Sequence, residues 1–95
     1  IAGLGENACL PEAVVMAETL RKQGTNARIL IINTTDFSHA LVVFLFPVDK
    51  PAVWVWDADT RSVQVTADFN KPEQVAHAWL DATLRDDTAL RASYL

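Results

Sequence analysis

Three side chains in this sequence have the chemistry of a nucleophile, a base and an orienting acid, namely Cys9, His39 and Asp57. A thiol reacts as its thiolate, an imidazole can take up the thiol proton, and a carboxylate can fix the orientation and tautomer of the imidazole. Together they would attack a carbonyl carbon and transfer its acyl group. Because the three positions are far apart in the chain, helices and strands must bring them together.

The residues around Cys9 predict a helix over positions 8–23. Apolar side chains recur at helical spacing and form one stripe that would face a core, made of Cys9, Ala13, Met16, Ala17 and Leu20. Pro11 suits the first turn of a helix and Gly24 suits its end. Cys9 is therefore expected at a helix start, where unpaired N–H groups would stabilise a thiolate. The alternative is that Cys9 is a small buried hydrophobic side chain.

Stretches rich in β-branched and aromatic residues predict strands at 27–33, 38–46, 52–57 and 60–66. The second and third should form a hairpin whose opposite residues have numbers that sum to about 98. That register brings Asp59 across from His39, at the start of the second strand, and Asp57 one pair away. We take Asp57 as the carboxylate that orients the imidazole and keep Asp59 as the alternative. A backbone partner at the strand start is the other reading of His39.

A second helix is predicted from Asn70 to about position 84. Asn70 has the character of an N-cap, and a proline and a glutamate follow it in the first turn. The helix should bury Val75, Trp79 and Ala82. We expect His77, in the same helix, to be structural or exposed.

Residues 86–95 are expected to form either a last short helix or a loose end. The order is thus a helix, three or four mostly antiparallel strands, and a helix. This order is typical of an α+β fold in which helices cover a small sheet.

Length and charge limit the classes of function. The 95 residues suffice for a single domain over positions 1–95, and the start at Ile1 predicts excision from a longer chain. A net charge of −4 without a basic cluster argues against nucleic acid as a partner. The longest apolar run, 40–48, is far below the roughly 20 residues of a membrane-spanning helix. We expect no signal peptide within this sequence, and the compartment stays open.

Metal and cofactor chemistry is not expected. The sequence has two histidines and one cysteine. They lie in different predicted elements and lack the clustered spacing of zinc ligands. A single cysteine also excludes a disulfide within the chain.

Four runs of residues resemble the transglutaminase-like branch of the papain-like cysteine hydrolases. They are Cys9-Leu10-Pro11-Glu12-Ala13, Gln23-Gly24-Thr25-Asn26-Ala27-Arg28, Ser38-His39-Ala40 and Trp54-Val55-Trp56-Asp57. The resemblance covers about the first two thirds of the sequence and implies a papain-like or transglutaminase-like core. It also implies that Cys9 is the acylated nucleophile, His39 its base and Asp57 the acid that orients the base.

The sequence departs from this family around the nucleophile. Family members often carry Gly-Gln-Cys-Trp, whereas this chain has Asn7-Ala8-Cys9-Leu10 and no upstream glutamine. The side chain of Asn7 and the backbone N–H of Cys9 remain as candidates for an oxyanion hole. Asn7 is alternatively a helix cap.

The resemblance implies a cysteine peptidase or amidase that acts on a peptide, protein or amide substrate. Two alternatives are a catalytically inactive fold that serves as a binding module and an acyltransferase that crosslinks proteins. A third, suggested by the short length, is a cleft that a neighbouring domain or a partner chain completes.

Overall fold

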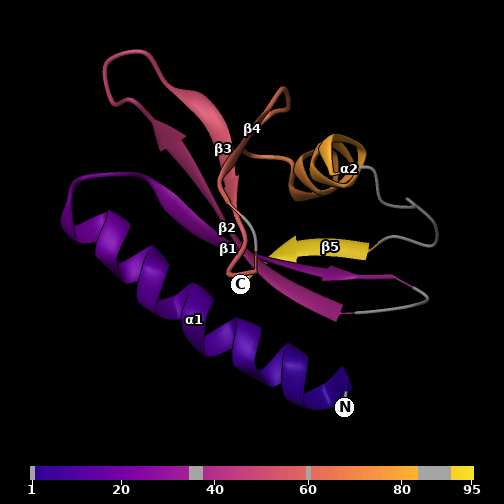
Figure 1. The fold of residues 1–95 in the computed structure, drawn as a ribbon. Coiled ribbons are helices and arrows are strands. Elements are labelled where there is room, and N and C mark those ends of the chain that lie inside the picture. Colours follow the sequence, from indigo (N-terminus) through magenta and orange to yellow (C-terminus); the bar gives the residue numbers. More distant parts are fainter. Residues whose placement is uncertain (1, 35–37, 60, 84–90) are drawn as a thin grey trace.

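Two helices and five strands make up the described part of this computed structural model, residues 2–34, 38–59, 61–83 and 91–95 (Figure 1). For residues 2–9 the description covers the backbone alone. The elements in chain order are α1 (Ala2–Lys22), β1 (Ala27–Asn33), β2 (Ser38–Phe46), β3 (Ala52–Trp56), β4 (Val63–Val65), α2 (Pro72–Ala82) and β5 (Arg91–Tyr94). The chain therefore has the α+β architecture that the sequence predicts.

The strands form one antiparallel sheet in the order β4-β3-β2-β1-β5. This sheet has five strands, so the expected three or four is wrong. The additional strand is β5, in which Tyr94 pairs with Leu30 of β1. The expectation of a helix or a loose end fails for Arg91–Tyr94, while positions 86–90 lie outside the described residues. Four residues carry little strand signal of their own, and their partner is a strand distant in sequence.

The β2–β3 hairpin has the register that the sequence predicts. Val42 lies opposite Trp56 and Val43 opposite Val55, so the paired numbers sum to 98. β1 and β2 also have the predicted bounds. β3 ends one residue earlier than expected, and β4 covers only Val63–Val65 of the predicted segment 60–66, whose first position lies outside the described residues.

The two helices cover opposite faces of the sheet (Figure 1). Alternate side chains of a strand point to opposite faces, so β2 contributes to two separate buried clusters. Leu41 and Val43 belong to the cluster under α2, which includes Trp79. Ala40 belongs to the cluster under α1, which includes Ala13.

α1 begins at Ala2, well before Cys9, so the prediction that the helix starts near Cys9 is wrong. Residues 2–8 contain no proline and continue the helix toward the N-terminus. Pro11 lies inside the helix, where its missing N–H removes one helical hydrogen bond. Cys9 therefore has no helix-start position whose unpaired N–H groups could stabilise a thiolate.

The other end of α1 agrees with the sequence. Gly24 has a φ of 83°, a left-handed conformation that glycine adopts without steric penalty. The N–H groups of Gly24 and Thr25 donate to the carbonyls of Arg21 and Leu20, at 3.0 and 2.9 Å. These bonds satisfy carbonyls of the last turn and direct the chain into β1.

α2 begins at Pro72 with Lys71 as its N-cap residue and without a side-chain cap, so the prediction that Asn70 caps this helix is wrong. Asp68 organises the approach instead. Its carboxylate accepts the N–H of Asn70 at 2.9 Å, and its carbonyl accepts the N–H of Lys71 at 3.0 Å. An Asp turn therefore precedes the helix where a cap was expected.

The buried face of α2 consists of Val75, Ala76, Trp79 and Leu80. Val75 and Trp79 are buried as predicted, whereas Ala82, the last residue of the helix, is exposed. His77 is exposed on the outer side of α2. Neither helix, over the residues described, has the length and apolar character needed to cross a membrane.

Tyr94 ties β5 to the segment before α2. Its hydroxyl donates to the carbonyl of Phe69 at 2.6 Å, and the Arg28 guanidinium carbon lies 4.5 Å from the ring centroid. Burial raises the pKa of Tyr94 to about 12, against an opposing effect of Arg28 and with a smaller contribution from Asp68. The phenol therefore keeps its proton in moderately alkaline solution.

Tyr94 is the only tyrosine in the sequence, so tyrosinate absorbance reports its ionisation alone. We expect the folded protein to titrate near pH 12 and the denatured chain near pH 10.0. Because the folded state binds this proton more tightly, the contribution of Tyr94 to stability is complete below pH 10 and lost as the pH rises toward 12. Tyr94→Phe should flatten that decline, and coincident titrations of the folded and denatured chains would contradict the prediction.

Candidate active site

His39 and Asp57 meet at one end of the β2–β3 hairpin. His39 is the second residue of β2, and Asp57 follows the last residue of β3. Nε2 of His39 lies 2.9 Å from Oδ1 of Asp57, a hydrogen-bond distance. The structure thus brings together two of the three residues that the sequence assigns to a catalytic site.

Asp57 is almost completely buried. Its residue is 1% exposed, whereas the His39 side chain retains 11% exposure. A carboxylate removed from water requires hydrogen bonds or a counter-charge, because the charged form is otherwise strongly destabilised. Oδ1 of Asp57 accepts the hydrogen bond with the imidazole and a second one from the N–H of Asp59, at 3.2 Å.

Asp59 takes the other role in this turn. Its side chain is exposed, and its backbone N–H, rather than its carboxylate, contributes to the site. The hydrogen bond from Asp59 N–H to the Asp57 side chain forms the local turn that aspartate favours. Of the two acids considered from the sequence, Asp57 is the one that contacts His39.

The hydrogen bond with Asp57 determines the chemistry of the ring. When neutral imidazole donates from Nε2 to a carboxylate, the proton is on Nε2 and the basic lone pair is on Nδ1. A carboxylate on Nε2 also stabilises the protonated ring. The pair can therefore accept a proton at Nδ1 and hold the resulting imidazolium.

Trp79 supports the imidazole from the side of α2. The two rings stack with centroids 6.0 Å apart and an interplanar angle of 28°. His39 has the same strand parity as Leu41, so its ring lies on the α2 face of the sheet. The sequence predicts burial of Trp79 but not this contact, which joins elements far apart in the chain.

Cys9 and Asn7 belong to α1, and their side chains lie outside the described part of the structure. Their backbone positions are informative. Position 9 is one helical turn before Ala13, which is fully buried in the cluster that also holds Ala40, the neighbour of His39. α1 thus carries position 9 toward the end of the sheet where β2 begins, on the face opposite to the His39 ring.

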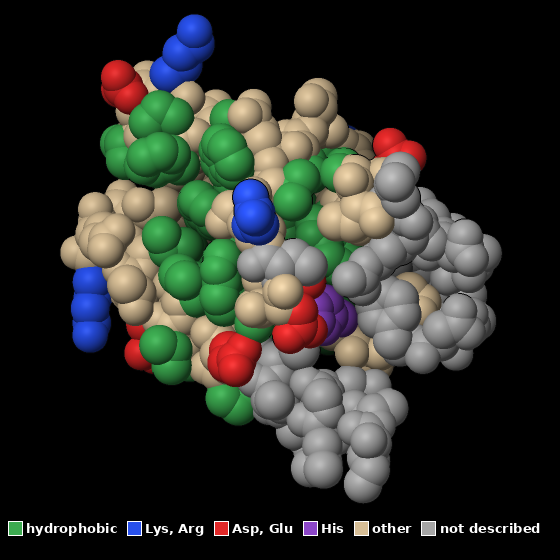
Figure 2. Space-filling view, in the orientation of Figure 1, with side chains coloured by type: hydrophobic (Ala, Val, Ile, Leu, Met, Phe, Trp, Pro, Cys, Tyr) green, Lys and Arg blue, Asp and Glu red, His purple; other side chains and the backbone are tan. Residues whose placement is uncertain are grey.

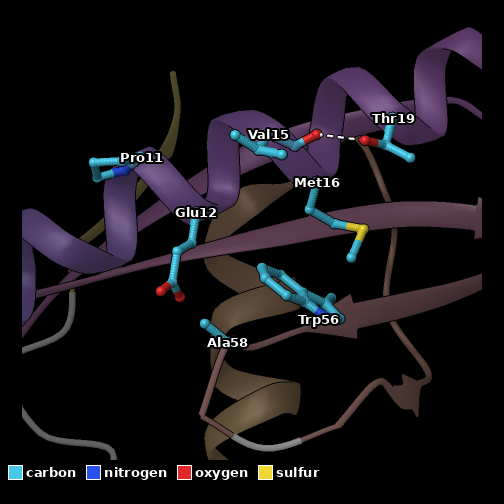
Figure 3. A pocket seen from close by; sticks show the side chains of 7 residues that line it. All are labelled: Pro11, Glu12, Val15, Met16, Thr19, Trp56 and Ala58. Carbon is cyan, nitrogen blue, oxygen red and sulfur yellow. Dashed lines mark hydrogen bonds between the residues drawn. The ribbon is translucent and has the colours of Figure 1, made fainter.

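A groove opens between α1 and the end of β3 (Figure 3). Its volume is about 440 Å³, and it is lined by Pro11, Glu12, Val15, Met16, Thr19, Trp56 and Ala58. Trp56 and Ala58 flank Asp57 in sequence, and Glu12 is close to position 9 along the helix. The sequence alone assigns no role to Glu12, although Glu12 and Met16 have the four-residue spacing of one helix face.

Metal ligands do not cluster in the residues that the structure describes. No group of three or more histidine, cysteine, aspartate or glutamate side chains lies close enough there to hold an ion.

Comparison with known proteins identified no relative of this chain. The chain matches no protein-family model, no curated protein and no solved structure.

We predict that His39 and Asp57 are energetically coupled. His39→Ala leaves the buried Asp57 carboxylate without the imidazole and should lower the free energy of unfolding by about 1–3 kcal/mol in urea denaturation. In a double-mutant cycle with Asp57→Asn, the coupling should be about 1 kcal/mol or more.

His77→Ala is the matched control, because His77 is an exposed histidine on α2. It should change stability by less than about 0.5 kcal/mol. Additive effects of His39→Ala and Asp57→Asn would show that the hydrogen bond contributes nothing measurable.

Proposed function

We propose that the chain is a cysteine hydrolase that cleaves peptide or amide bonds by acyl transfer, with Cys9 as nucleophile, His39 as base and Asp57 as orienting acid. The observation that carries the proposal is the 2.9 Å hydrogen bond between His39 and the buried Asp57. Burial of a carboxylate opposes folding, and two apolar side chains would fill the same space at lower cost. An oriented imidazole gives such a pair a chemical use.

The proposed reaction transfers one proton at each step. Nδ1 of His39 accepts the thiol proton of Cys9, and the sulfur bonds to the substrate carbonyl carbon. The carbon–nitrogen bond then breaks, and the imidazolium protonates the departing amine, which leaves a thioester. Water, deprotonated by the same ring, attacks the thioester and releases a carboxylic acid and the thiol. Asp57 stays ionised throughout.

Activation of the thiol depends on the imidazole in this proposal. Because α1 begins at Ala2, the dipole at the helix start is too distant to stabilise a thiolate at position 9. The ion pair between thiolate and imidazolium then supplies the stabilisation. Asn7 remains the candidate side-chain donor for the oxyanion, together with the backbone N–H of Cys9.

The proposal places one demand on the geometry. The His39 ring lies on the α2 face, whereas α1 covers the other face, so the thiol must meet the ring beyond the end of the sheet where β2 begins. Both elements reach that end, because Ala13 and Ala40 share one buried cluster. The order of a helix with the cysteine, a strand with the histidine and a strand end with the aspartate supports a papain-like or transglutaminase-like core.

The reaction needs only protein side chains and water, so we expect no cofactor. The substrate is a peptide, protein or other amide, and an amine in place of water would make the chain a crosslinking acyltransferase. A neighbouring domain or a partner chain is a further means of enclosing the cleft.

A second candidate is a binding module that keeps the fold without the chemistry. It is favoured by the position of Cys9 inside α1 and by the placement of His39 on the α2 face. Under this reading the His39–Asp57 pair serves stability alone. Cys9→Ala separates the candidates, because a binding module keeps its ligand affinity and its cellular effect.

Cys9 is the only cysteine, so iodoacetamide labelling reports its reactivity directly. We expect alkylation near neutral pH to be faster than that of the denatured chain, and His39→Ala to remove the difference. Hydrolysis of a fluorogenic peptide library should fall by at least about 100-fold in His39→Ala and be lost in Cys9→Ala.

His77→Ala again serves as the control and should leave both rates unchanged. Labelling at the rate of an ordinary thiol in the folded protein, with no turnover of any library member, would refute the hydrolase and leave the binding module.

A further inference from the structure

On the α1 face of the sheet, the helix leaves part of the strand surface uncovered. A helix is about 10 Å wide and neighbouring strands are about 4.8 Å apart, so one helix covers roughly two strands. Ala13 and Ala17 are fully buried, and these small side chains let α1 lie close over β1 and β2. On β3 the same face carries Trp54 and Trp56, which are only partly covered. The groove lies between this strand and the outer side of α1.

The groove is apolar along most of its length and acidic at one end. Figure 3 shows Glu12 and Met16 pointing from α1 toward Trp56 and Ala58. Glu12 is the only charged residue among the described residues that line it. Hydrophobic side chains gather between α1 and the β2–β3 hairpin, with acidic side chains at one end of the band and a basic side chain over its middle (Figure 2).

We infer that this groove is the substrate subsite of the proposed hydrolase and that it selects a peptide segment whose apolar and basic side chains are two residues apart, in one of the two possible orders. The inference rests on the proposed function, since it treats the groove as the place where substrate lies before acyl transfer. A large apolar side chain would pack on Trp56 and Met16. A lysine or arginine two residues away would place its charge at Glu12.

The distance between the acidic and the apolar end of the groove determines the spacing of the two peptide residues. Glu12 and Met16 are four residues apart, which is about 6 Å along a helix. In an extended peptide, side chains that point to the same side are two residues apart, about 6.6 Å. The two distances agree, whereas adjacent peptide residues point to opposite sides and cannot fill both ends.

Volume and charge agree with such an occupant. The groove of about 440 Å³ is within the range of small-ligand sites and is large enough for one aromatic side chain with adjoining backbone. The carboxylate of Glu12 complements a cation, and the aliphatic stem of lysine can lie on apolar surface while its ammonium group stays in water. An acidic peptide would instead meet repulsion at Glu12.

The test measures binding without turnover. In the Cys9→Ala protein, we would measure the affinity of two test peptides, acetyl-Phe-Ala-Lys-amide and acetyl-Lys-Ala-Phe-amide. Two kinds of control peptide are measured beside them. In the first, glutamate replaces lysine; the second, acetyl-Phe-Lys-Ala-amide, has the apolar and basic residues adjacent. The indole N–H signals of the tryptophans in a nitrogen–proton NMR spectrum locate the site. Trp56 should shift on binding, whereas Trp79, fully buried on the other face, should not.

We expect one of the two lysine test peptides to bind about 2- to 5-fold more tightly than its glutamate version and than the peptide with adjacent apolar and basic residues. Glu12→Gln should abolish that preference. Glu18→Gln is the matched control, an exposed glutamate of α1 outside the groove lining, and should keep it. Val15→Ser, at a groove residue that is 64% exposed, should weaken the binding of the lysine peptide and of its glutamate version equally.

The outcomes separate the groove from the reaction. Selective binding that depends on Glu12 supports the subsite even if the unmodified protein hydrolyses nothing, a result that would remove only the hydrolase. Equal binding of lysine and glutamate peptides, or a preference that survives Glu12→Gln, would overturn the subsite even if the protein proves to be a hydrolase.

Discussion

Folding removes the carboxylate of Asp57 from water, and the residues around it replace the lost hydration. A buried aspartate is tolerable only with hydrogen-bond donors at fixed positions, and His39 and the backbone N–H of Asp59 are two of them. The imidazole also stacks on Trp79, so this ring links β2 to the end of β3 through a hydrogen bond and to α2 through a ring contact. The same contact assigns the ring its basic nitrogen.

The two faces of the sheet differ in how completely they are covered, because a different helix packs on each. α2 contributes a large indole and aliphatic side chains to a buried cluster that includes residues of β1, β2, β3 and β4. α1 contributes alanines, lies close to the sheet and leaves the tryptophans of β3 partly open. The proposed chemistry and the proposed substrate groove therefore adjoin through residues 56–58, whose alternate side chains belong to opposite faces.

Local signals in the sequence were sufficient where neighbours in the chain are neighbours in space. The β2–β3 register and the contact of His39 with Asp57 follow from one short loop and strand alternation. β5 was missed because its partner, β1, is remote in sequence and no local pattern announces the pairing. The start of α1 was misplaced because Pro11 is typical of a first turn but lies inside this helix. Asn70 has the residue type and position of a helix cap, but the turn before α2 is formed by Asp68, two residues earlier.

The position of β5 beside β1 has a consequence for the order of folding. β2, β3 and β4 each pair with a strand that is next to them in the chain, so a meander can assemble as those residues become available. The last place in the sheet, beside Leu30, stays empty until Tyr94 arrives. Until that late closure the outer edge of β1 exposes unpaired amides and carbonyls, and a chain emerging from the ribosome would pass through a stage that is susceptible to intermolecular strand pairing.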